Sequence, residues 1–198
     1  MGSKNHRESG HFLAQQPGYV KQDTSRVFTS IVRDIEQKAA TLPDLSQRYK
    51  EKILNSALAL LLAQKPELAV KALGAPGSAH ELMIDECLGH QLVVPVYQHF
   101  GRCNAARMIF PAATKDMGFF AALTERRVSA VITCDAARSG PKDLCYIANA
   151  AYRTGDENLP GVIVVPQDHG RAKNLLLANK GRVFDYLAQP RAQVLDLA

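Results

Sequence analysis

The stretch Val128-Ser129-Ala130-Val131-Ile132-Thr133-Cys134-Asp135 decides the fold class, because it is apolar at consecutive positions and ends in a carboxylate. A second stretch, Leu82-Met83-Ile84-Asp85-Glu86, has the same form. Strands that are apolar at both alternating positions must be covered on both faces, which is typical of a parallel sheet between helices. Four runs predict such strands: residues 82–84, 108–110, 128–133 and 162–165.

Helix-length segments separate these apolar runs. They cover residues 89–100, 116–127, 143–154 and 170–187. Strands that alternate with helices along a chain predict an α/β fold with a mostly parallel sheet. We therefore expect a three-layer α/β/α sandwich over residues 80–190, preceded by an N-terminal helical region and followed by a C-terminal tail, residues 191–198.

The N-terminal region divides into two parts. Residues 1–24 are polar and are predicted to be a flexible tail. Residues 25–76 contain apolar stripes at three- and four-residue steps, which predict helices; the stripes are Val27/Ile31/Ile35 and Ile53/Leu54/Leu58/Leu61. These stripes must be buried, either against the α/β domain or in a partner-binding or dimerisation arm.

The composition is that of an ordinary globular protein. The chain has 198 residues, of which 46% are hydrophobic and 22% charged, with a formal net charge of +5. These values exclude a wholly disordered chain and a coiled coil. No apolar run is long enough for a membrane span, and the first twenty residues lack the apolar core of a signal peptide. We expect a cytoplasmic protein without membrane association.

The sequence lacks the motifs of several common metal-binding, nucleotide-binding and hydrolase sites. The four cysteines, Cys87, Cys103, Cys134 and Cys145, form no Cys-x-x-Cys pair, and we interpret them as reduced core residues. A phosphate-binding Gly-rich loop and the Gly-x-Ser-x-Gly elbow of serine hydrolases are also absent. No His pair has zincin-type spacing, so the histidines are interpreted as surface or packing residues.

Acidic residues at strand ends carry the functional prediction. Asp85 and Glu86 follow one predicted strand and Asp135 follows another, while Asp116 and Asp143 each open a predicted helix. The carboxyl ends of parallel strands meet at one edge of a sheet, so these acids are expected to converge there. Converging carboxylates repel one another, and Mg²⁺ or Mn²⁺ is the natural counterion. Helix N-caps and polar strand ends are the alternative roles for these acids.

The order of these motifs resembles the PIN-like nucleases, in particular the branch that includes VapC-type toxins and the Mut7-C/DUF5615 group. The resemblance spans about residues 81–190 and rests on 82–88, 114–116, 131–135 and 159–165. It implies that Asp85, Asp116 and Asp135 bind the metal, that Thr133 supports Asp135, and that Glu86 is a further acid. Where that family often has Asp-Phe after the third acid, this chain has Ala137-Arg138, and Asp143 is the candidate replacement.

The predicted activity is endonucleolytic cleavage of RNA by a metal-activated water. Arg138 and Lys115 are candidate contacts to the substrate phosphates, with Ser139 as an additional donor. Two alternatives stay open. One is a catalytically inactive interaction module that dimerises through its N-terminal helices or binds an antitoxin-like protein, and the other is an RNA-binding protein without chemistry.

Overall fold

The computed structural model describes residues 47–110, 116–137, 140, 143–155, 159–189 and 194–198. The chain divides after Lys50 into two compact units. Almost all of the described helices and strands belong to the second unit, Glu51–Ala198. They are α2 (Gln47–Gln64), α3 (Pro66–Leu73), β1 (Glu81–Ile84), the 3-10 turn η2 (His90–Leu92), α4 (Val93–His99), β2 (Arg102–Ala105), α5 (Ala106–Ile109), α6 (Asp116–Glu125), β3 (Ala130–Thr133), α7 (Leu144–Thr154), β4 (Gly161–Val164), α8 (His169–Ala178), α9 (Lys180–Ala188) and β5 (Val194–Asp196).

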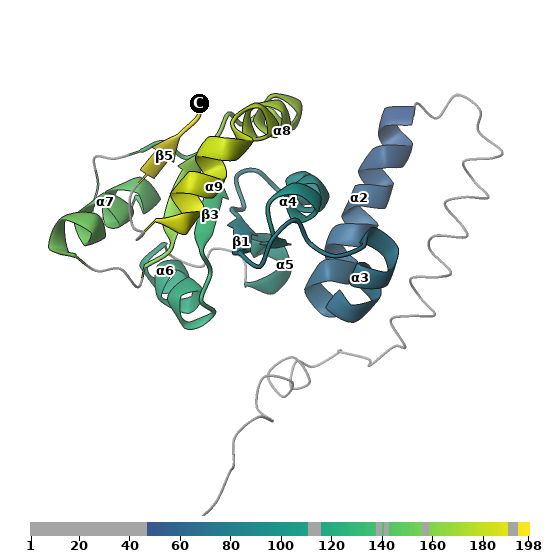
Figure 1. Cartoon of the computed structure of the whole chain (residues 1–198), viewed down its shortest axis with the longest axis horizontal. Helices are drawn as coiled ribbons and strands as arrows, with labels where there is room; N and C mark the ends of the chain where they lie inside the picture. Colours follow the sequence, from purple (N-terminus) through teal and green to yellow (C-terminus); the bar gives the residue numbers. More distant parts are fainter. Residues whose placement is uncertain (1–46, 111–115, 138–139, 141–142, 156–158, 190–193) are drawn as a thin grey trace, which may run out of the picture. The chain divides into compact units, whose positions relative to one another are not determined.

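The five strands form one parallel sheet in the order β2-β1-β3-β4-β5 (Figure 1). The three central strands are buried along almost their whole length, which explains why their sequences are apolar at every position. The chain moves from β1 outward to β2 and then returns past β1 to β3. The strand order therefore reverses between β1 and β3.

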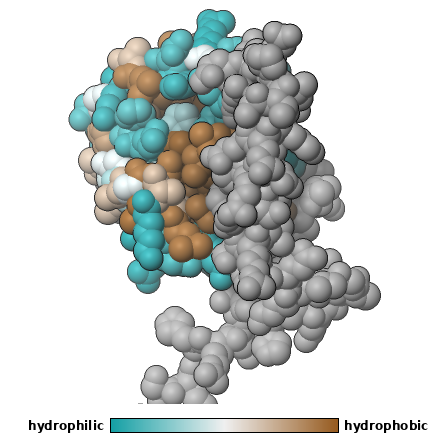
Figure 2. All heavy atoms as spheres, turned by 90° about the vertical axis from the view of Figure 1, so that its right-hand side faces the viewer, coloured by the Kyte–Doolittle hydropathy of each residue, from teal (hydrophilic) through white to brown (hydrophobic). Residues whose placement is uncertain are grey.

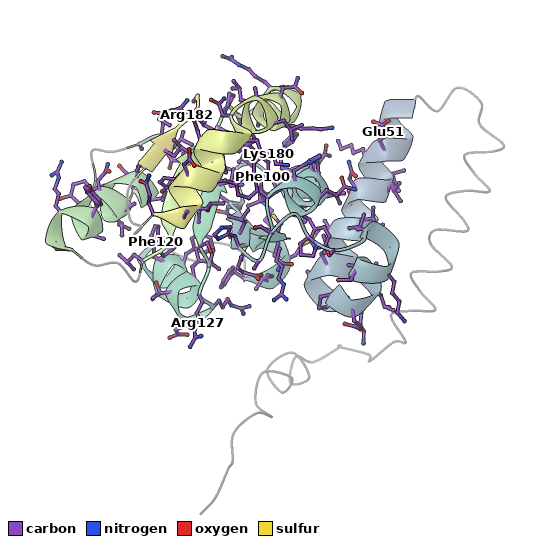
Figure 3. The ribbon with its side chains drawn as sticks, viewed as in Figure 1. Glu51, Phe100, Phe120, Arg127, Lys180 and Arg182 are labelled. Atoms are coloured by element: carbon purple, nitrogen blue, oxygen red, sulfur yellow. The ribbon has the colours of Figure 1, made fainter. Side chains whose placement is uncertain are left out.

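Apolar side chains cover both faces of the sheet. On one face, Met83, Val131 and Val162 pack in a cluster with residues of α5, α6 and α7. The alternate strand residues, such as Ile84 and Ile132, are also buried, and α4, α8 and α9 lie on their side (Figure 1). Figure 3 marks an aromatic side chain from each group of helices, Phe100 at the end of α4 and Phe120 in α6. The arrangement is compatible with a three-layer α/β/α fold.

Two helices precede the sheet, and polar groups join them to η2 and α4. Ser56 of α2 lies 2.6 Å from His90 Nε2, and the Tyr97 hydroxyl of α4 donates to the carbonyl of Gly74, which ends α3. Both helices also keep apolar side chains in solvent, namely Leu54, Leu60 and Val70, and apolar surface is visible on this side of the molecule in Figure 2. The predicted stripe of residues 27–35 lies outside the described residues.

Three sequence expectations about secondary structure are wrong. Residues 108–110 do not form a strand, because Met108 and Ile109 lie in the short helix α5 and the strand is β2 just before it. The predicted helix 170–187 is interrupted at Asn179, whose side-chain amide donates to the carbonyl of Leu175. The segment expected as a C-terminal tail contains β5, which pairs with β4.

Within the described part of the chain, none of the helices is both long and apolar enough to cross a bilayer.

Candidate functional site

The point where the strand order reverses brings two predicted acids to neighbouring strand ends. Asp85 directly follows β1, and its backbone amide extends the ladder by donating to the Ile132 carbonyl of β3 at 2.9 Å. Asp135 lies two residues beyond the end of β3. In open α/β sheets, ligands bind outside the carboxyl ends of the strands at such a reversal. The topology therefore selects this edge as the candidate site.

The Asp85 carboxylate is half-buried and is held by three neutral donors. Oδ1 accepts from the Glu86 amide at 2.7 Å, and Oδ2 accepts from the Thr133 hydroxyl at 2.7 Å and the Cys87 thiol at 3.2 Å. Among the described residues, no basic side chain forms an ion pair with Asp85. A half-buried carboxylate without a cationic partner is costly, because hydrogen bonds replace only part of its lost hydration.

Thr133 connects the two acids. Its side chain is completely buried, and its Oγ1 donates to Asp85 while it accepts from the backbone amide of Asp135 at 2.9 Å. The resemblance assigned Thr133 to Asp135 alone. The structure shows that it also positions Asp85, so this one hydroxyl joins the ends of β1 and β3.

Asp135 is exposed, and its orientation is set by its own loop. Oδ1 accepts from the Ala137 amide at 2.9 Å, while no described residue donates to Oδ2. Its carbonyl accepts from the thiol of Cys145 in α7 at 3.4 Å, which ties the loop to the following helix. As far as the described residues go, one carboxylate oxygen of Asp135 is thus available to a ligand at the edge of the sheet.

The other predicted acids are placed differently. Glu86 is exposed, and Asp143 stands at the N-terminus of α7, where its Oδ2 accepts from the Gly140 amide at 2.8 Å instead of capping the helix. Asp116 is the first residue of α6, but its side chain lies outside the described part, as do Lys115, Arg138 and Ser139.

This edge of the sheet offers a divalent ion a small number of carboxylate oxygens as ligands. Among the described side chains, no three His, Cys, Asp or Glu residues converge to hold a metal ion. Mg²⁺ commonly uses only one or two protein carboxylates and keeps several waters, so Asp85 and Asp135 suit it in chemistry. The ligand that would complete the predicted set is Asp116.

Two cysteines belong to the site, which the sequence did not reveal. All four cysteines are free as expected, but only Cys103 and Cys145 are buried, while Cys87 and Cys134 are half-buried at the ends of β1 and β3. The interpretation of all four as core residues is wrong for this pair. Burial, the Cys134 side chain and the nearby Asp85 raise the pKa of the Cys87 thiol to about 12. Cys87 therefore stays protonated and donates to Asp85.

Two histidines and an arginine also lie near this edge. His169 opens α8, and its Nε2 donates to the Leu88 carbonyl in the loop after β1, which requires the Nε2–H tautomer or the imidazolium. Burial, together with the positive charges of His169, Arg107 and Lys52, lowers the pKa of His90. The exposed Arg107 follows β2 at the same edge, and its positive charge contributes to the lowered pKa of His90.

Other basic residues have structural partners. Arg126 lies over the Phe110 ring at 5.2 Å, and Lys180 lies over the Phe184 ring at 5.7 Å. Arg182 donates to Asn179 at 3.0 Å, and Lys180 and Arg182 are both labelled in Figure 3. Asp168 caps α8 by accepting from the Arg171 amide at 2.7 Å, and the Arg171 side chain is exposed. Arg107 and Arg171 are thus the described exposed arginines that follow strand ends.

The residues at this edge of the sheet combine two kinds of charged group. Its distinctive features are a half-buried carboxylate held by neutral donors, a second carboxylate on the adjacent strand, and arginines after two other strands. Comparison of the chain with protein-family models, with curated proteins and with solved structures finds no match.

Proposed function

We propose that the chain is a metal-dependent endoribonuclease with a PIN-like three-layer fold, and that Asp85, Asp116 and Asp135 bind Mg²⁺ or Mn²⁺. One observation carries the proposal: Asp85 and Asp135 follow adjacent parallel strands at the reversal of strand order, joined by the buried Thr133 hydroxyl. Carboxylates at such an edge, without a described cationic partner, favour a divalent counterion.

The protein's own residues would orient the ion and the substrate. Thr133 fixes one oxygen of Asp85 and the backbone of Asp135, and the Ala137 amide holds Oδ1 of Asp135, so both carboxylates are oriented before a ligand binds. Such preorganisation matters because reorganising charged groups during a reaction raises its barrier. A bound divalent ion would lower the pKa of a coordinated water and neutralise charge on the phosphate.

RNA is the proposed substrate because its phosphates match the charge of the protein. The whole chain carries a net charge of +5, and Arg107 and Arg171 are exposed after the ends of β2 and β4. Arginine binds phosphate oxygens through paired N–H groups. These two residues join Arg138 and Lys115 as candidate phosphate contacts.

Cleavage of labelled RNA with Mg²⁺ or Mn²⁺ tests the proposal. Asp85→Asn and Asp135→Asn keep the size of each side chain but remove its charge, and each is expected to lower the rate at least about 100-fold because the ion loses a ligand. Asp185→Asn, at an exposed position in α9, is the matched control and is expected to leave the rate unchanged. Equal cleavage by the site variants and the control would contradict the proposal.

The same experiment separates the alternative, an RNA-binding or interaction module without catalysis. That alternative is favoured by the lack of three converging ligands among the described side chains. It predicts salt-sensitive RNA binding that needs no metal and survives Asp85→Asn, with no cleavage under any condition. This alternative includes dimerisation through the N-terminal helices and binding of an antitoxin-like protein.

A further inference from the structure

Cys87 and Cys134 are 47 positions apart in the chain and touch at the candidate site. The backbone amide of Cys134 donates to Cys87 Sγ at 3.2 Å, and the Cys134 side chain is close enough to raise the pKa of the Cys87 thiol. Both residues are free and half-buried. Two cysteines at the ends of adjacent strands are thus in contact, and both are partly exposed to small molecules.

The surroundings of Cys87 are polar, unlike those of a cysteine that fills a core. Its Sγ lies 3.2 Å from Asp85 Oδ2 and 3.3 Å from Thr133 Oγ1. Cys103, by contrast, is buried in β2, and its Sγ lies 3.9 Å from the carbonyl oxygen of the adjacent Asn104. Packing accounts for Cys103 but leaves the paired arrangement of Cys87 and Cys134 unexplained.

We propose that Cys87 and Cys134 form a reversible intramolecular disulfide when the protein meets a peroxide. The two loops need little movement, because a 3.2 Å hydrogen bond from the Cys134 amide to Cys87 Sγ already joins them. The bond would form in the folded protein and would link the end of β1 to the end of β3.

The chemistry balances with hydrogen peroxide as the oxidant. The Cys134 thiolate attacks one peroxide oxygen, the O–O bond breaks, and the products are a Cys134 sulfenic acid and, after proton uptake, one water. The Cys87 sulfur then attacks the Cys134 sulfur, the S–O bond breaks and a second water leaves. The Cys87 proton passes to Asp85 Oδ2, its present acceptor, and on to the departing hydroxide. In total, two thiols and one peroxide give one disulfide and two waters.

The order of the two steps follows from the environments of the two sulfurs. The Cys87 thiol donates its hydrogen to Asp85 Oδ2 at 3.2 Å, and a sulfur that keeps this hydrogen is a poor nucleophile, so Cys134 is assigned as the sulfur that reacts first. A dithiol reductant reverses the reaction by thiol–disulfide exchange. In the oxidised state Cys87 has no proton to donate, so Asp85 loses one of its three neutral donors.

Mass spectrometry of the full-length protein tests this proposal without any substitution. The folded protein is treated with hydrogen peroxide near neutral pH, then denatured and alkylated. We expect a product lighter by two hydrogen atoms, two of the four thiols protected from alkylation, and a cross-linked peptide containing Cys87 and Cys134. Cys103 and Cys145 serve as internal controls, and a dithiol should restore all four thiols.

Two variants sharpen the result. Cys134→Ser is expected to keep its three thiols after peroxide, and Cys87→Ser is expected to stop at a sulfenic acid on Cys134 that dimedone captures. The proposal is overturned if the wild-type protein gains oxygen at either cysteine without losing two hydrogen atoms, or if both thiols are alkylated as completely after peroxide as before. RNA cleavage plays no part in this measurement, so its outcome is independent of the proposed nuclease activity.

Discussion

The Thr133 hydroxyl donates a 2.7 Å hydrogen bond to Oδ2 of Asp85, from the last residue of β3 to the first residue beyond β1. Thr133 is completely buried, so water cannot replace this bond when it is removed. Oγ1 of Thr133 also accepts a hydrogen bond from the Asp135 amide at 2.9 Å. A single side-chain oxygen therefore bonds to both acids.

Replacing this oxygen by a methyl group, in Thr133→Val, is expected to lower the free energy of unfolding by about 1–3 kcal/mol, because buried partners are left unsatisfied. Urea denaturation followed by circular dichroism measures the change. Thr133→Ser keeps the hydroxyl and should retain more stability than the valine variant. If valine proves as stable as serine, the hydroxyl does not hold the strand ends together.

The central strands could be predicted from sequence because their environment leaves a clear pattern. β1, β3 and β4 are covered on both faces, so apolar residues at consecutive positions mark them. β2 and β5 are edge strands with one neighbour each, and residues such as Arg102 and Asp196 are exposed. An edge strand needs no continuous apolar run, so the apolar residues of α5 were the stronger signal.

The candidate site could be predicted only in part for a similar reason. Acids at strand ends are visible in the sequence, because the end of an apolar run fixes where the sheet edge lies. The contact between Cys87 and Cys134 depends on strand register and on the turn at residues 85–89, which the spacing of the cysteines does not encode. The break at Asn179 was hidden because the apolar periodicity continues through it.

The lowered pKa of His90 predicts a specific loss of stability in acid. Burial and the positive charges of His169, Arg107 and Lys52 oppose its protonation in the folded state. As the pH falls below 6.5, the ordinary pKa of histidine, His90 binds a proton in the unfolded chain but not in the folded protein. The free energy of unfolding therefore falls. Above that value, His90 is neutral in both states and has no such effect.

Substituting His90→Gln removes this titration while keeping a polar group that can reach Ser56, its 2.6 Å partner. Urea denaturation at pH 7.5 and pH 5 is the measurement. The wild type is expected to lose more stability between the two values than the variant does. Parallel losses in both proteins would show that other groups account for the acid sensitivity.

Tyr186 of α9 hydrogen-bonds to the backbone of β4 at Val162. Its hydroxyl accepts from the Val162 amide at 2.8 Å and donates to the Val162 carbonyl at 3.2 Å, and burial raises the pKa of Tyr186, so the proton is retained. Tyr186→Phe is expected to cost about 1–3 kcal/mol in free energy of unfolding. Tyr152→Phe, at an exposed position in α7, is the matched control for urea denaturation and should have almost no effect.

Gly161 is glycine because the Tyr186 ring leaves no room for a side chain. A Cβ at this position would lie 2.3 Å from the Tyr186 hydroxyl oxygen and 2.9 Å from the adjacent ring carbon. Gly161→Ala is therefore expected to lower the free energy of unfolding by about 1–3 kcal/mol through overpacking. Because the hydroxyl makes the closest contact, adding Tyr186→Phe should relieve part of the clash. In urea denaturation, the double variant is then expected to lose less stability than the sum of the losses of the two single variants. Strictly additive losses would show that the Tyr186 hydroxyl does not clash with a side chain at position 161.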